Sequence, residues 1–373
     1  MQLDISLSAR LLEHTPTTVA SYHLVAIIKA VHMHKGVIVA GMHRSGTSAM
    51  TRVLNLLGCA LPEDLVGPNI GNERGHWESI ELVSLNDKIL TAAGTSWDDW
   101  MTVNADWRFS QLRDDAVEKA SQIVERHRGL GPLFVMKDPR ISKIADIWLD
   151  AFDKARVEPA LIIMLRDPIE VASSLARRDL MNPAYGQLLW LRYMLDAEFY
   201  SRGRKRLVCR FDRFLENWSS LVESLRSGLD LFFPRNSALI HNEIDQFLDA
   251  QERHFRSNPD LVTGNPNLSP WIREVYAILL KWSMKGEDPT DWPNLDAIRS
   301  DFDRSAPAFS RLILPGTQSG VPGDGARLLE LQMQLEQARL ASAEAESATQ
   351  SSNASLTEAQ AREETLVAQI EAL

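Results

Sequence analysis

The chain has 373 residues and is 45% hydrophobic, so it can bury the core of one large domain or of two modest ones. Its formal net charge of -10 argues against a nucleic-acid-binding protein, because contacts with phosphates require a basic face. No apolar run reaches the roughly 20 residues that a membrane span requires. The two cysteines, Cys59 and Cys209, have neither a zinc-site nor a disulfide-framework spacing, and we expect a reducing, cytoplasmic environment.

The first 35 residues have no strong structural signal. Residues 1–35 show neither the basic start nor the small-residue cleavage site of a secretory signal. Their longest apolar run, at 24–28, ends at Lys29. We therefore expect an N-terminal arm with little structure of its own, followed by the main domain over residues 36–315.

Short apolar runs alternate with longer helical patterns throughout the main domain. The expected strands are 36–40, 133–136, 161–165 and 206–210. The expected helices are 46–57, 79–93, 111–127, 142–155, 168–178, 185–202, 213–227, 241–255 and 269–285. Strands that are apolar along their whole length suit a parallel sheet covered on both faces. The alternation predicts an α/β, P-loop-type layered fold with a parallel central sheet flanked by helices.

A change in composition follows the main domain. Residues 316–325 are rich in glycine and are predicted to form a linker. Residues 326–373 contain no glycine, proline or aromatic residue, and a heptad register can be laid on them. Polar residues interrupt the middle of that register, so a single helical tail and a coiled coil both remain open. Such a tail could support self-association or link the chain to a further domain.

A phosphate-binding loop is predicted where the first strand ends. Gly41 and Gly46 frame a G-x-x-x-x-G turn that leads from the strand into a helix. The amides at such a helix start attract anions, and Thr47 and Ser48 add hydroxyl donors. The lysine that a nucleoside triphosphate loop places after its last glycine is missing, and Arg44 is the nearby cation. The loop is therefore suited to an anion other than a triphosphate.

A second anion site is predicted at the end of the strand 161–165. Asp167 can cap the following helix, and Pro168 suits its first position. Arg166 then lies at the strand end and Ser174 about two turns into the helix. One phosphate at the carboxyl edge of the sheet could be reached by both side chains. Taken alone, an Arg-Asp-Pro stretch is also a common way to begin a helix, so both interpretations remain open for this stretch.

These two stretches resemble the nucleotide motifs of the sulfotransferases that use 3'-phosphoadenosine 5'-phosphosulfate (PAPS). Arg44-Ser-Gly-Thr-Ser48 is similar to their 5'-phosphosulfate loop, and Arg166 followed eight residues later by Ser174 is similar to their 3'-phosphate motif. Phe211 stands where the family usually has a tyrosine near the adenine. The glycine-rich C-terminal motif of the cytosolic enzymes is not found, which points to the bacterial, carbohydrate-type branch. The cofactor-binding residues that this resemblance implies are Arg44, Ser45, Gly46, Thr47, Ser48, Ala49, Arg166, Ser174 and Phe211.

Catalysis requires a base for the acceptor hydroxyl and positive charge at the leaving oxygen. Glu78, in Gly75-His-Trp-Glu-Ser79, is the preferred base, because bacterial members of the family often carry a Gly-aromatic-Glu segment there. His76 is its substitute, and Asp138 is a rival base or an orienting group. Lys137, at the end of the second strand, resembles a family lysine that faces the transferred group and acts with Arg44. A lysine and an aspartate at a strand end could equally be a buried structural pair. No metal cluster is evident.

The sequence thus predicts transfer of a sulfuryl group from PAPS to an acceptor hydroxyl. Trp77, Trp97, Trp100 and Trp107 suggest a carbohydrate or glycolipid acceptor, although ordinary core packing explains them nearly as well. One alternative is a P-loop nucleotide or sugar kinase, which the missing lysine disfavours. The other is a nonenzymatic coiled-coil scaffold, which leaves the paired anion sites unexplained.

Overall fold

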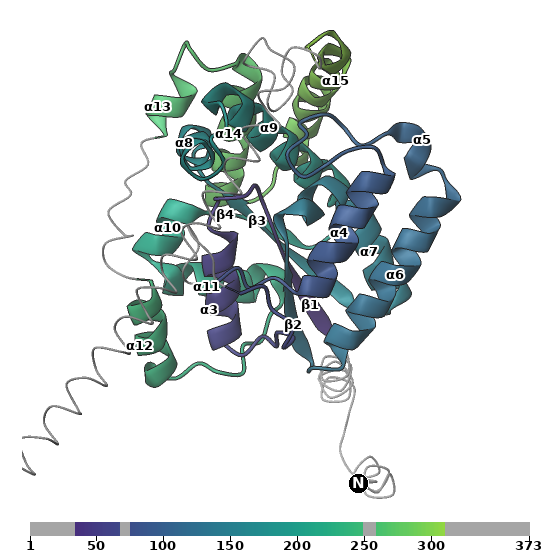
Figure 1. The fold of residues 1–373 in the computed structure, drawn as a ribbon. Helices are drawn as coiled ribbons and strands as arrows, with labels where there is room; N and C mark the ends of the chain where they lie inside the picture. The colour runs from purple at the N-terminus through teal and green to yellow at the C-terminus, as the bar shows by residue number, and fades with distance from the viewer. Residues whose placement is uncertain (1–33, 68–74, 249–258, 310–373) are drawn as a thin grey trace, which may run out of the picture. The chain divides into compact units, whose positions relative to one another are not determined.

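Four parallel strands form the central sheet, in the order β2-β1-β3-β4 (Figure 1). They are β1 (Lys35–Ala40), β2 (Leu133–Lys137), β3 (Glu158–Leu165) and β4 (Arg206–Arg210). The computed structural model describes residues 34–67, 75–248 and 259–309. All four expected strands are present, and β3 starts earlier than its apolar run because Glu158 and Pro159 already pair with β1.

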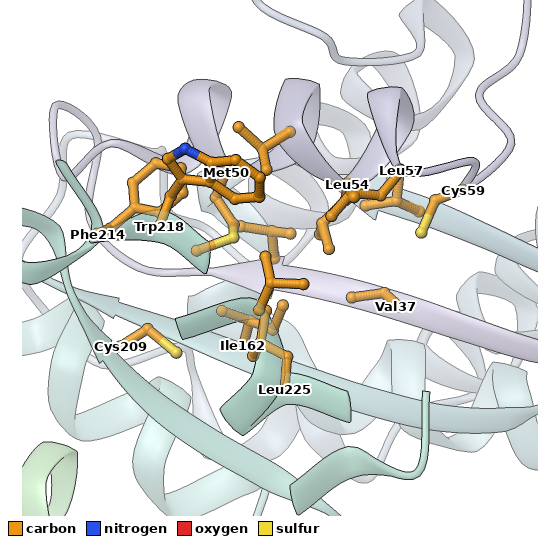
Figure 2. Packing of buried hydrophobic residues seen from close by; sticks show 14 of the residues in the cluster. Val37, Met50, Leu54, Leu57, Cys59, Ile162, Cys209, Phe214, Trp218 and Leu225 are labelled. Carbon is orange, nitrogen blue, oxygen red and sulfur yellow. The ribbon is translucent and has the colours of Figure 1, made fainter. Parts of the chain in front are cut away.

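Helices cover both faces of this sheet, which explains why the strands are apolar throughout. Val37 and Val39 of β1 pack with α3 (Thr47–Leu56), α11 (Trp218–Leu229) and α12 (Ala238–Phe247). Ile38 packs on the opposite face with α4 (Ile80–Ala92), α6 (Gln111–Arg128) and α7 (Ala145–Lys154). Figure 2 shows the first of these layers, where the α3 side chains lie against those of β1 and β3. The predicted fold class is confirmed.

The other helices that bear on the site follow β3 and β4. The chain continues from β3 into α8 (Pro168–Asp179) and α9 (Pro183–Tyr200). The short α10 (Phe211–Glu216) begins directly after β4. The remaining elements are α5 (Ala105–Arg108), α13 (Asp260–Thr263), α14 (Pro270–Lys285), η3 (Pro289–Asp291) and α15 (Trp292–Phe309).

Several helical segments differ from the sequence-based prediction. The helix expected at 241–255 is α12, which ends at Phe247, and residues 249–255 of that expectation lie outside the described residues. The helix expected at 142–155 begins as a 3-10 helix, η1 (Pro139–Ile144), and becomes α-helical at Ala145. The helix expected at 213–227 is two helices, because Asn217 is extended and its side chain accepts the amide of Ser220 to cap α11. The long helix α15 was not predicted. None of these differences moves a predicted site residue away from its loop.

The strand order brings distant loops to one edge of the sheet. β1 lies between β2 and β3 in the sheet. After β1 the chain forms β2 on one side of it, and then crosses over to form β3 on the other side. In open α/β sheets, ligands bind outside the carboxyl ends of the strands at such a reversal. The Gly41–Gly46 loop, Lys137, Arg166 and Phe211 all follow or end strands at this edge.

The predicted arm, apart from residues 34 and 35, lies outside the described residues, as do the linker and the tail. Lys35, the last residue of the predicted arm, is already part of β1. Residues 1–33 and 310–373 carry most of these segments, so the domain boundaries and the proposed association through the tail remain predictions. In the part of the chain that the structure describes, no helix is both long enough and apolar enough to cross a membrane.

Candidate active site

The loop between β1 and α3 depends on two glycines with positive φ. Gly41 has a φ of 132°, and a Cβ atom there would lie 2.8 Å from the carbonyl oxygen of Met164. Its amide donates to the hydroxyl of Ser142 at 2.9 Å, which ties the loop to η1. Gly46 caps α3 without a side-chain hydrogen bond to the first turn. The amides of that first turn are therefore available to an anion.

Substituting Gly46 with alanine is expected to destabilise the protein and to impair nucleotide binding. Gly46 has a φ of 84°, and an added Cβ would lie 2.1 Å from Cδ2 of Phe211. Gly94→Ala is the matched control, because Gly94 also has a positive φ of 72° but no atom lies within 4 Å of its added Cβ. We expect Gly46→Ala to lower the unfolding free energy by about 1–3 kcal/mol more than the control. Equal losses in chemical denaturation would show that the close contact with Phe211 is unimportant.

The two predicted anion loops meet through direct hydrogen bonds. Arg44 Nε donates to Ser174 Oγ at 2.8 Å, although 130 residues separate them. Arg166 Nη1 donates to the carbonyl oxygen of Arg44 at 2.8 Å. Arg166 also pairs with Glu170 at 2.9 Å, and its guanidinium lies 4.8 Å from the centre of the Phe211 ring. The side chains predicted for the two phosphates thus form one connected group.

A cavity of about 550 Å³ opens beside this group. Its walls include residues of the first loop, of Gly75–Glu78 and of α8, together with Lys137 and Phe211. Eight of the nine predicted cofactor-binding residues line it, which are Arg44, Gly46, Thr47, Ser48, Ala49, Arg166, Ser174 and Phe211. Ser45 is fully buried and does not line it, and its amide closes a turn onto Met42.

Lys137 is the centre of a buried polar cluster on the wall of the cavity. Its ammonium donates to Glu78 Oε1, to Ser48 Oγ at 3.0 Å and to the carbonyl oxygen of His76 at 3.0 Å. Lys137 and Glu78 are 3% and 6% exposed, so this ion pair is almost completely withdrawn from water. Glu78 precedes Ser79, the N-cap of α4, and is therefore not an acid of the first helical turn.

Burial raises the pKa of Glu78, although the neighbouring ammonium of Lys137 lowers it in part. A carboxylate with a raised pKa is a stronger base. Burial also lowers the pKa of His76, and the charges of Lys137 and Arg178 add to this effect. His76 Nε2 is buried and has no hydrogen-bond partner in the described structure. Both base candidates thus lie beside one cavity and one lysine.

Asp138 lies apart from this cluster. It is 0% exposed and does not line the cavity. Its carboxylate accepts from Asn86 at 2.8 Å and from the amide and guanidinium of Arg140 at 3.0 and 3.1 Å. These contacts suit an orienting group at the start of η1 rather than a group that meets a substrate.

The tryptophans separate into two groups. Trp100 and Trp107 are buried, and Trp100 stacks on Phe302. For these two residues, core packing is the correct interpretation. Trp77 lines the cavity with a φ of 56°, and Trp97 lies beside His43 with their ring centres 4.8 Å apart.

The cavity-lining residues that sequence reasoning missed include His43, Arg177 and Arg178. His43 is a non-glycine member of the first loop, and its Nε2 is another buried atom without a partner in the described structure. Arg177 and Arg178 follow Ser174 by three and four residues on α8, so helical periodicity could have placed them on the same face. Orphaned polar atoms and surplus cations on one wall are consistent with a polar, anionic ligand.

The fold and the site together define a P-loop-type α/β protein with a cavity lined by several cationic side chains at the carboxyl edge of its sheet. The chain belongs to the sulfotransferase family, because the model of that family matches residues 36–223. This match confirms the family resemblance, whereas the carbohydrate-type branch remains a prediction. No curated protein matches the chain at a significant level.

Several solved structures align with the chain at low similarity. The sulfotransferase domain from the curacin biosynthetic pathway has 15% identity and a TM-score of 0.39, with 66% of this chain and 98% of that one covered. The domain from the Synechococcus PCC 7002 olefin synthase has 15% identity and a TM-score of 0.35, with coverages of 66% and 89%. Sulfotransferase STF9 from Mycobacterium avium has 13% identity and a TM-score of 0.39, with coverages of 77% and 80%.

Proposed function

We propose that this protein is a sulfotransferase that moves the sulfuryl group of PAPS to the hydroxyl of an acceptor, with a carbohydrate or glycolipid as the acceptor class. The observation that carries the proposal is the connection between the two anion loops. Arg44 touches Ser174, and Arg166 holds the backbone of Arg44, beside one cavity. A ligand with two separated anionic groups suits this arrangement better than a triphosphate does.

The lining residues fit such a nucleotide. The first turn of α3 and Arg44 would hold the 5'-phosphosulfate, and Arg166 with Ser174 would hold the 3'-phosphate. The Phe211 ring, buried on one side by Gly46 and Arg166, would support the adenine. When bound, PAPS supplies the sulfuryl group and a phosphate leaving group.

Glu78 accepts the proton of the acceptor hydroxyl in this proposal. The acceptor oxygen forms its bond to sulfur while the bond from sulfur to the bridging oxygen breaks, and the negative charge moves to that oxygen. Lys137 and Arg44 stabilise this charge. Because Lys137 already contacts Glu78 and Ser48, one ammonium joins the base to the phosphosulfate loop. His76 and Asp138 remain the alternatives for the base, although Asp138 does not line the cavity.

Two other functions fit the site less well. A kinase site would need its loop lysine and a magnesium site, and Thr47 occupies the position after Gly46. A scaffold would not require buried ionisable residues around a cavity. Cytoplasmic location and bacterial origin remain predictions from the sequence.

The desulfo nucleotide 3'-phosphoadenosine 5'-phosphate (PAP) is expected to raise the melting temperature more than ATP with magnesium does. Only PAP presents a 3'-phosphate to Arg166 and Ser174, and stabilisation grows with the logarithm of ligand concentration over Kd. Adenosine 5'-phosphate is the control that lacks only the 3'-phosphate. Equal shifts, or a larger shift with ATP and magnesium, would contradict the cofactor assignment.

A further inference from the structure

The cavity has more positive charge than the two anion loops account for. Among the lining residues that the structure describes, five side chains are cationic and two are carboxylates. The proposed nucleotide contacts use three of the cations, which are Arg44, Lys137 and Arg166. The other two are Arg177 and Arg178, at the end of α8. This surplus stands out in a chain whose formal net charge is -10.

Arg178 lies close to His76, one of the candidate bases, and its charge lowers the pKa of that histidine. Its guanidinium is 5.6 Å from the ring centre of Trp97, and the His43 ring is 4.8 Å from the same ring. Burial lowers the pKa of His43 well below its ordinary value, and the charges of Arg140 and Arg178 add to this. The imidazole is therefore neutral at neutral pH and does not supply the charge itself. In the proposed reaction the acceptor hydroxyl must approach Glu78 or His76, and both residues line the same cavity as Arg178.

The charges of the two arginines are only partly compensated. Arg178 donates to both carboxylate oxygens of Asp179, at 2.7 to 2.9 Å. No described residue forms a hydrogen bond or ion pair with Arg177, which is exposed although it lines the cavity. Arg177, Arg178 and Asp179 all line the cavity, so this part of its wall has a net positive charge. Guanidinium groups bind carboxylates and phosphates through paired hydrogen bonds.

We propose that the acceptor carries an anionic group, a carboxylate or a phosphate, in addition to its accepting hydroxyl, and that Arg177 and Arg178 bind this group. The inference rests on the proposed sulfotransferase function and specifies its acceptor. The nucleotide end of the cavity is defined by Arg166, Phe211 and Ser174. Arg178 contacts Trp97, whose neighbour is His43. Its charge also acts on Arg44 and on His76, so Arg178 lies between the phosphosulfate loop and a candidate base, where the acceptor would bind.

Binding of matched sugar pairs to the full chain saturated with PAP tests this proposal. Methyl glucuronide against methyl glucoside tests a carboxylate, and glucose 6-phosphate against glucose tests a phosphate. Calorimetric titration is expected to show that at least one anionic sugar binds about tenfold or more tightly than its neutral partner. The preferred pair identifies the anionic group. Equal binding within both pairs, or no binding of any of the four sugars, would overturn the proposal.

Variants then assign the preference to the two arginines. Arg177→Gln, Arg178→Gln and the double variant are expected to remove it while the Kd for PAP stays within about twofold. Arg226→Gln is the matched control, since Arg226 lies on α11 and pairs with Glu223. If the variants weaken the binding of PAP as much as the binding of the anionic sugar, the arginines bind the nucleotide and the proposal is wrong. If the wild-type chain does not bind PAP at all, the proposed function itself fails.

Discussion

Glu78→Gln is expected to lower turnover by about a hundredfold or more and to leave the Kd for PAP almost unchanged, because the substitution removes a general base but keeps the shape of the side chain. Glutamine can still accept the hydrogen bond of Lys137 through its carbonyl oxygen. It cannot take the proton of the acceptor hydroxyl. Turnover at saturating PAPS, together with calorimetric binding of PAP, separates the two effects.

Glu81→Gln is the matched control for this experiment. Glu81 lies three residues further along, is half exposed and pairs with Arg126 on the surface. We expect it to retain normal turnover. If Glu78→Gln is also near normal while His76→Ala abolishes activity, the base is His76. The same outcome with Asp138→Asn would assign the base to Asp138, and the two anion loops would keep their roles in either case.

Local signals predicted much of the fold and part of the site. The apolar runs of β1 to β4 and the glycines around Arg44 are properties of short stretches, and parallel topology brings strand ends to one edge. The pairing of Lys137 with Glu78 joins residues 59 positions apart, and no local pattern encodes it. The sequence also could not show which tryptophans are buried in the core and which line the cavity. Trp100 and Trp107 belong to an aromatic and acidic stretch of the kind that sugar-binding loops contain, but their side chains lie in the core.

The missed residues have physical reasons of their own. His43 is flanked by the better-known motif residues, and only its orphaned Nε2 draws attention to it. Arg177 and Arg178 look like ordinary cations in the last turn of a helix, where positive charge interacts favourably with the helix dipole. Their role depends on which wall of the cavity α8 forms. That information comes from the packing of α8 with α9 and with the loop that carries Arg44, and not from the helix alone.

Lys137→Met is expected to lower turnover by about a hundredfold to a thousandfold, the effect of removing one preorganised charge from a transition state. PAP lacks the sulfuryl group, so its Kd should change far less than turnover does. The substitution also leaves Glu78 buried without its partner, which costs stability. Turnover is therefore expressed per PAP-binding site. Lys154→Met is the control, because Lys154 pairs with Glu118 on the surface.

The pH profile gives Lys137→Met a second readout. The ammonium of Lys137 lowers the pKa of Glu78, so its removal raises that pKa further. The carboxylate is the active form of the base, and activity is lost as the pH falls through this pKa. The acid limb should therefore move to higher pH in Lys137→Met and stay in place in Lys154→Met. Turnover within tenfold of wild type and an unmoved acid limb would show that Lys137 is only a structural partner of Glu78.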